Sequence, residues 1–99
     1  MHHTAATLGS VLVDISQDIQ FLKPKEIYIR ETWDPFITRI RALGRDAPDD
    51  YTGSQLIRAV FIIWDLQGQR GPKHKEKVRQ KLLKHLRDLH TNVANTPTT

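Results

Sequence analysis

The stretch that decides the fold is SQLIRAVFIIWDLQ, residues 54–67, in which nine of fourteen residues are apolar. Within the apolar run only Arg58 and Asp65 are charged, so the structure that forms here needs cover on nearly every side. The run is much shorter than the roughly 20 apolar residues that cross a bilayer. It therefore indicates the core of a water-soluble domain rather than a membrane span.

This stretch has to be assigned to a helix or to a strand. Residues 60–64, VFIIW, favour strands by propensity, but the rest of the chain offers only one weak strand with which they could pair. The stretch is too long for an ordinary strand. Thr52 or Ser54 can cap the start of a helix by accepting backbone N–H bonds, and Gly68 can end it. We therefore predict a buried central helix near residues 54–67.

Three further helices are expected around it. Apolar residues spaced by three and four predict a helix over residues 8–22 that ends near Pro24. Asp34 as N-cap and Pro35 after it predict a short helix that Gly44 closes, with residues 25–32 before it as an extended connection or a short irregular helix. The last helix is expected from Lys73 to residue 90 or 92. Its buried stripe is expected to contain Val78, Leu82, Leu86, Leu89 and Val93.

Length and composition agree with this plan. The chain has 99 residues, 38% hydrophobic and 26% charged, which is typical of one globular domain. We predict an all-α fold, a small bundle of four or five helices over residues 1–94, followed by a flexible tail or linker start at 95–99. The chain contains no cysteine, which excludes disulfides and thiolate nucleophiles. Its start lacks the features of a secretory signal, which favours a cytoplasmic or nuclear location.

Positive charge is concentrated on the last helix. The chain carries +4 overall. Between residues 73 and 92 seven bases stand against two acids, a balance of +5, whereas the remaining eight bases and nine acids give −1. The seven bases are Lys73, Lys75, Lys77, Arg79, Lys81, Lys84 and Arg87. All but Lys75 and Arg79 fall within about 120° of one another on a helical wheel at about 100° per residue.

Such a face can neutralise several phosphates, and the release of their counterions makes binding strongly dependent on salt. The face has no aromatic residue that could stack on a base, so contact with the nucleic-acid backbone is favoured over sequence reading. Trp33 and Trp64 are interpreted as core or edge-of-core residues. The sequence therefore predicts a non-enzymatic domain that binds nucleic acid or another polyanion through the seven bases, with Lys75 and Arg79 contributing from outside the main face.

Three other interpretations remain open. The basic face can be the ordinary charged side of an amphipathic helix. It can instead dock on an anionic membrane, as retroviral matrix domains do, although no matrix motif is present and His2 stands where myristoylation requires glycine. The third is a protein-interaction or assembly module, in which part of residues 60–64 contacts a partner or a second copy. An exposed apolar patch of several hundred Å² would favour this last interpretation over the nucleic-acid and membrane interpretations.

Acidic pairs suggest no enzyme. Asp14 and Asp18 are four residues apart on one helix, but nothing nearby completes an acid–base or cation site, so a solvated face is favoured. Asp49 and Asp50 precede the central helix and complement its dipole, because no further oxygen ligands follow at the spacing of a calcium loop.

Histidines suggest no metal site either. The last helix carries His74, His85 and His90, at spacings that point the rings in different directions. We interpret His85 as a packed, hydrogen-bonded residue and His90 as a C-terminal cap. Tyr51 is expected to cover the core. We predict no catalytic residue, no metal and no cofactor.

Overall fold

The computed structural model describes residues 5–95, which form four long helices and two short ones. The described residues contain no strand, so the predicted all-α helical bundle is confirmed. The elements are α1 (Ala5–Gln20), α2 (Pro24–Ile27), the 3₁₀ helix η1 (Arg30–Trp33), α3 (Asp34–Arg45), α4 (Asp50–Gln67) and α5 (Pro72–Asn95). Of the predicted tail at 95–99, only Asn95 lies within the described residues, as the last residue of α5.

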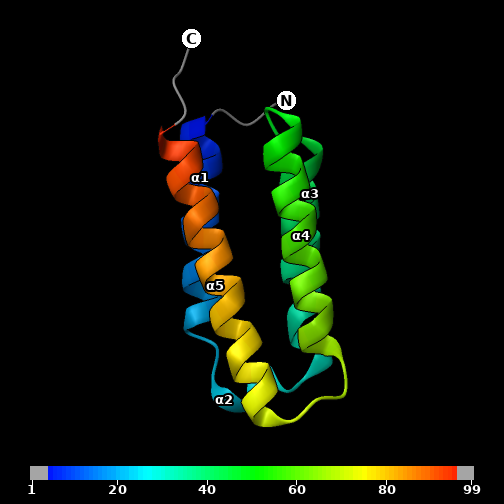
Figure 1. Cartoon of the computed structure of the whole chain (residues 1–99). Helices are drawn as coiled ribbons and strands as arrows, with labels where there is room; N and C mark the ends of the chain where they lie inside the picture. Colours follow the sequence, from blue (N-terminus) through cyan, green and yellow to red (C-terminus); the bar gives the residue numbers. More distant parts are fainter. Residues whose placement is uncertain (1–4, 96–99) are drawn as a thin grey trace.

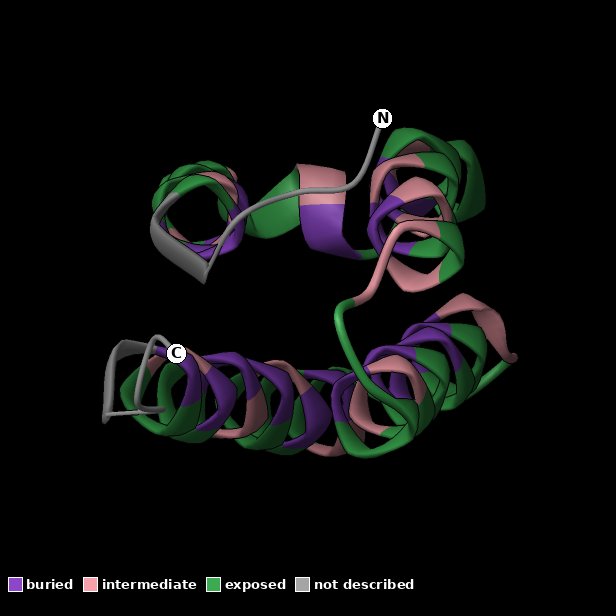
Figure 2. Ribbon diagram, turned by 90° about the horizontal axis from the view of Figure 1, so that it is seen from above, coloured by how far each residue is buried: buried purple, intermediate pink, exposed green. Residues whose placement is uncertain are grey.

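The four long helices run up and down in turn, each antiparallel to the next (Figure 1). Seen from above, they occupy the four corners of a bundle (Figure 2). Helix α1 packs against α5, α3 against α4, and α4 against α5. Each long helix therefore has a side that faces away from its neighbours.

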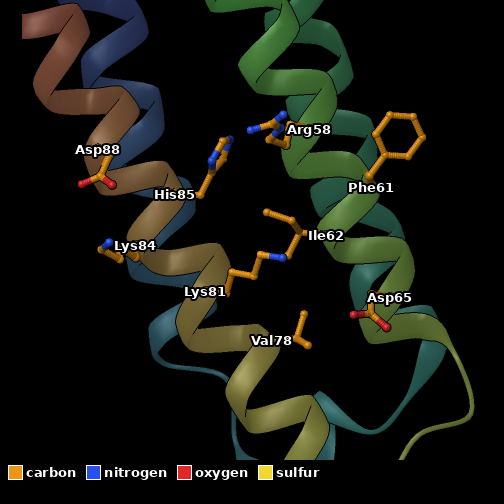
Figure 3. Close-up of a pocket in the computed structure, with 9 residues that line it drawn as sticks. All are labelled: Arg58, Phe61, Ile62, Asp65, Val78, Lys81, Lys84, His85 and Asp88. Atoms are coloured by element: carbon orange, nitrogen blue, oxygen red, sulfur yellow. The ribbon is translucent and has the colours of Figure 1, made fainter.

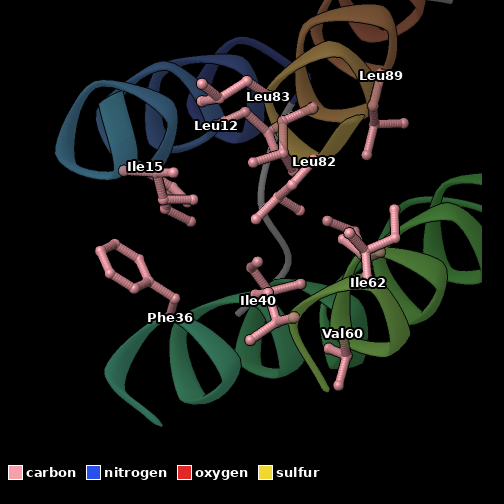
Figure 4. Packing of buried hydrophobic residues seen from close by; sticks show 14 of the residues in the cluster. Leu12, Ile15, Phe36, Ile40, Val60, Ile62, Leu82, Leu83 and Leu89 are labelled. Atoms are coloured by element: carbon pink, nitrogen blue, oxygen red, sulfur yellow. The ribbon is translucent and has the colours of Figure 1, made fainter. Parts of the chain in front are cut away.

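The core contains 21 buried apolar side chains from every helix of the described chain. All five residues of the predicted α5 stripe are among them. Leu83, which the helical wheel places off the edge of that stripe, is also buried and belongs to the same core cluster as Leu12 of α1 (Figure 4). The buried surface of α5 is wider than one stripe because α5 packs against both α1 and α4.

The connection between α1 and α3 is anchored by Trp33. Its side chain has no exposed surface, its indole Nε1 donates a 3.0 Å hydrogen bond to the carbonyl of Ile27, and its ring centroid lies 5.7 Å from that of Phe36. The segment expected to be extended or irregularly helical forms α2 and η1, two short helical turns. The indole ties them to the core, so this connection belongs to the folded domain.

The start of α3 differs from the sequence prediction. The prediction that Asp34 is an N-cap is wrong, because η1 continues directly into α3 and Asp34 is already its first residue. The carboxylate of Asp34 instead accepts a 2.8 Å hydrogen bond from Nε2 of Gln67, at the end of α4. A side chain expected to start one helix thus joins two helices.

Of the two ends of α4, only the C-terminal end agrees with the prediction. The N-cap is neither Thr52 nor Ser54 but Asp49, whose Oδ1 accepts a 2.7 Å hydrogen bond from the backbone N–H of Thr52. The helix consequently begins at Asp50, earlier than expected. Its C-terminal end is as predicted, because α4 stops at Gln67 and Gly68 is the C-cap.

Candidate binding surfaces

The exposed side of α5 carries the charge that the sequence places there. Five of the seven predicted bases are exposed, and among the residues that the structure describes none of these five is in an ion pair. Between the first and the last of them the helix rises about 21 Å, at 1.5 Å per residue. We call this surface the basic face of α5. It consists of Lys73, Lys77, Lys81, Lys84 and Arg87.

Arg79 does not add to this face. Only 13% of its side chain is exposed, and its guanidinium pairs with both carboxylate oxygens of Glu76, with Nη2 to Oε1 at 2.6 Å and Nε to Oε2 at 3.1 Å. The hydrogen bond from Arg79, supported by one from Gln80, holds the pKa of the Glu76 carboxyl below its usual value. Glu76 therefore stays ionised, and the charge of Arg79 is neutralised locally.

Lys75 has a different environment from the one expected. The sequence predicts that it binds the anionic partner from outside the main face, but the residue is 7% exposed and its Nζ donates a 2.9 Å hydrogen bond to the carbonyl of Leu66. That carbonyl belongs to the last turn of α4, where backbone acceptors lack intrahelical partners and the helix dipole is negative. Lys75 therefore caps α4 from α5 and does not present its charge on the surface.

This contact leads to a prediction about stability. Replacing Lys75 with methionine keeps most of the apolar stem but removes the ammonium, and we expect the free energy of unfolding to fall by about 1.5 to 3 kcal/mol. Lys77→Met is the matched control at an exposed position and should change it by no more than about 0.5 kcal/mol. Urea unfolding followed by circular dichroism measures both variants. Equal effects at the two positions would show that the capping contact does not matter.

A groove of about 500 Å³ lies along the surface between α4 and α5 (Figure 3). Arg58 of α4 and His85 of α5 point toward one another across it, and Lys81 reaches from α5 toward α4. His85 donates from Nε2 to the carbonyl of Gln55 at 2.8 Å, which confirms the prediction that it is packed and hydrogen-bonded. The groove residues are Arg58, Phe61, Ile62, Asp65, Val78, Lys81, Lys84, His85 and Asp88.

The side of α4 that faces away from the bundle is apolar. Ile57, Phe61 and Trp64 lie at spacings of four and three, and 56%, 58% and 48% of each residue is exposed. The Phe61 and Trp64 rings meet edge to face, with centroids 5.2 Å apart. Figure 3 shows the Phe61 ring turned away from α5. We call these three residues the apolar face of α4.

The expectation that this helix is covered on nearly every side is therefore wrong for one face. A helix at the corner of a four-helix bundle contacts two neighbours, so its outward side has no protein to cover it. The sequence does contain a signal for this face. Residues 54–67 are apolar on most sides, although three partner helices with one stripe each supply too little surface to surround them.

Beside the apolar face, a groove of about 390 Å³ lies between α3 and α4. Its lining is mostly apolar, and the charged residues in it are Arg41 and Arg45 of α3. Both arginines are exposed. The lining consists of Ile40, Arg41, Gly44, Arg45, Leu56, Ile57, Val60, Phe61 and Trp64, with no acidic residue among them.

His74, His90, Tyr51 and a metal site were also considered from the sequence. His74 pairs with Asp65 at 3.1 Å. His90 is not a C-terminal cap, because α5 continues to Asn95 and the His90 ring lies against Gly9, where the missing side chain makes room. Tyr51 does not cover the core, since 57% of it is exposed. Within residues 5–95, no three His, Asp or Glu side chains are grouped so that they could hold a metal ion.

Comparison with protein-family models, with curated proteins and with solved structures gives no match. None of the helices in the described part of the chain combines the length and apolar character needed to span a membrane. The chain is therefore a small all-α bundle with a basic face on α5 and an apolar face on α4.

Proposed function

We propose that this chain is a non-enzymatic binding domain that holds the phosphate backbone of nucleic acid on the basic face of α5. The observation that carries the proposal is the row of five exposed bases along one helix, none of which is in an ion pair with another residue of the described range 5–95. A row of about 21 Å corresponds to roughly six base steps at 3.4 Å per step along one strand.

The composition of the face supports contact without sequence reading. The same side of the helix carries one acid, Asp88, four residues after Lys84, and no aromatic side chain. Phosphate contacts position a protein on nucleic acid, whereas sequence is read by contacts with base edges. The proposed activity is therefore electrostatic binding of backbone, with little preference among sequences.

A salt titration tests this proposal. We expect the association constant for a labelled 16-base-pair duplex to fall with salt on a log–log plot with a slope of about −4.5, as five neutralised phosphates require. For a single strand of equal length the slope is expected near −3.5. Fluorescence anisotropy measures both, beside sedimentation with vesicles rich in phosphatidylserine. Binding to vesicles alone would assign the face to a membrane instead, and a flat salt dependence would contradict phosphate binding.

A second candidate function is a protein-interaction module. The specific observation that favours it is the apolar face of α4, where three large side chains are about half exposed. Their combined exposed area is on the order of 300 to 400 Å², within the range of apolar patches that often serve in binding. This face and the basic face belong to different helices, so the two functions are compatible in one domain.

A further inference from the structure

We infer that the apolar face of α4, together with the α3–α4 groove, binds an acidic amphipathic helix of another protein. The inference rests on the second candidate function and names the class of partner. It is independent of nucleic-acid binding, because the residues involved do not belong to the basic face of α5.

The apolar side chains match a helical ligand in size and spacing. From Ile57 to Trp64 the exposed row extends about 10 Å, or two helical turns. A helix that lies along it can present apolar residues at spacings of three, four and seven, the usual pattern of a helix bound in a groove. The groove beside the row, about 390 Å³, provides a concave apolar site for one or two of those side chains.

The charges at the edges select an acidic partner. Arg41 and Arg45 line the α3 edge, and Arg58 is exposed on the α5 side of the apolar face. Within the described residues none of these three is in an ion pair, whereas the nearby Arg39 is paired with Asp18 at 2.8 Å. Glutamates that flank the apolar residues of a bound helix would meet available guanidinium groups on both edges.

A second copy of the same chain fits this surface less well. An isologous dimer over the apolar face would bring equivalent arginines toward one another, which opposes association. The exposed apolar area is also only about half of the roughly 800 Å² that each partner buries in a standard interface. A helix seated in the groove avoids both difficulties, because it covers side chains on α3 and α4 and supplies the opposite charge.

The test uses designed peptides of 18 residues. One carries leucines at helical spacing flanked by glutamate, a second has the same leucines flanked by lysine, and a third has the acidic composition in scrambled order. Trp33 is fully buried and Trp64 is half exposed, so a blue shift of tryptophan emission on binding reports on Trp64. We expect the acidic amphipathic peptide to bind and the other two to bind at least about tenfold more weakly.

Variants locate the site. Phe61→Ala is expected to weaken binding of the acidic peptide by about thirtyfold, as for an interface anchor. Phe21→Ala, at a more exposed position outside the site, is the control and should leave it unchanged. Replacing Arg41 and Arg45 with glutamate should weaken the acidic peptide about tenfold and strengthen the lysine-flanked one.

Three results would overturn the inference. The first is equal binding of the acidic and lysine-flanked peptides, or no binding of the acidic peptide. The second is loss of a concentration-dependent dimer in Phe61→Ala, which would make a second copy the occupant. The third is vesicle binding that Phe61→Ala abolishes, which would make the face a membrane contact. None of these results depends on whether the basic face of α5 binds nucleic acid.

Discussion

Replacing Trp33 with alanine is expected to lower the free energy of unfolding by about 3 to 5 kcal/mol, the range for large aromatic side chains in cores. The indole has no exposed surface, contacts the Phe36 ring and donates to the Ile27 carbonyl. Truncation leaves a cavity and also leaves a buried acceptor without its partner. In a domain of this size the midpoint of thermal unfolding should fall by about 4 to 8 °C for each kcal/mol lost.

Trp64→Ala is the matched control, because it removes the same side chain from a half-exposed position. We expect its cost to stay below about 1.5 kcal/mol, since only part of the ring leaves a packed environment. Thermal and urea unfolding followed by circular dichroism measure both variants. If both tryptophans cost the same, the assignment of Trp33 to the core and of Trp64 to the surface would be wrong.

Reversing Lys73, Lys77, Lys81 and Lys84 to glutamate is expected to abolish nucleic-acid binding without unfolding the domain. Each reversal removes one positive charge and adds one negative charge, so the four together change the net charge of the chain from +4 to −4. The binding constant depends on the number of phosphates neutralised, and the variant has one positive residue of the basic face left, Arg87. All four lysines are exposed, so their replacement does not disturb the core.

Two double variants distinguish the effect of the position of the charges on duplex binding from the effect of the net charge. Lys77→Glu with Lys84→Glu should weaken duplex binding by at least about tenfold at low salt. Arg41→Glu with Arg45→Glu changes net charge equally but acts on α3, and it should change duplex binding by less than about threefold. The order should be reversed for the acidic peptide of the further inference: the Arg41, Arg45 variant should weaken its binding more than the Lys77, Lys84 variant does. Equal loss of duplex binding in both variants would show that net charge, and not the basic face, controls binding.

Much of the fold follows from residue patterns that are local in sequence. The α5 stripe from Val78 to Val93 is buried because a helix places residues three and four apart on one side. Gly68 ends α4, and His85 is packed and hydrogen-bonded, both as predicted. The five bases of the basic face are exposed together for the same reason of periodicity.

The roles of Lys75 and Arg79 required the tertiary structure. The helical wheel places both off the basic face, Lys75 within the buried stripe and Arg79 at its edge, but it does not show which group each side chain contacts. Lys75 is buried because the last turn of α4 lies where its ammonium can reach the Leu66 carbonyl. Arg79 is mostly buried and is paired with Glu76. Glu76 is close in sequence, but the sequence alone does not show that Arg79 pairs with it rather than with another acid.

By itself, then, the sequence determined the all-α class, the position of the long helices and the row of charge on α5, because these depend on periodicity and on local stop signals. Only the tertiary structure decided which side of α4 is covered. Residues 54–67 are apolar on most sides, and hydrophobicity alone cannot distinguish Ile63, which is fully buried, from Phe61, which is mostly exposed. That distinction depends on where α3 and α5 lie, since two neighbours cover two sides of a helix and leave the outward side open.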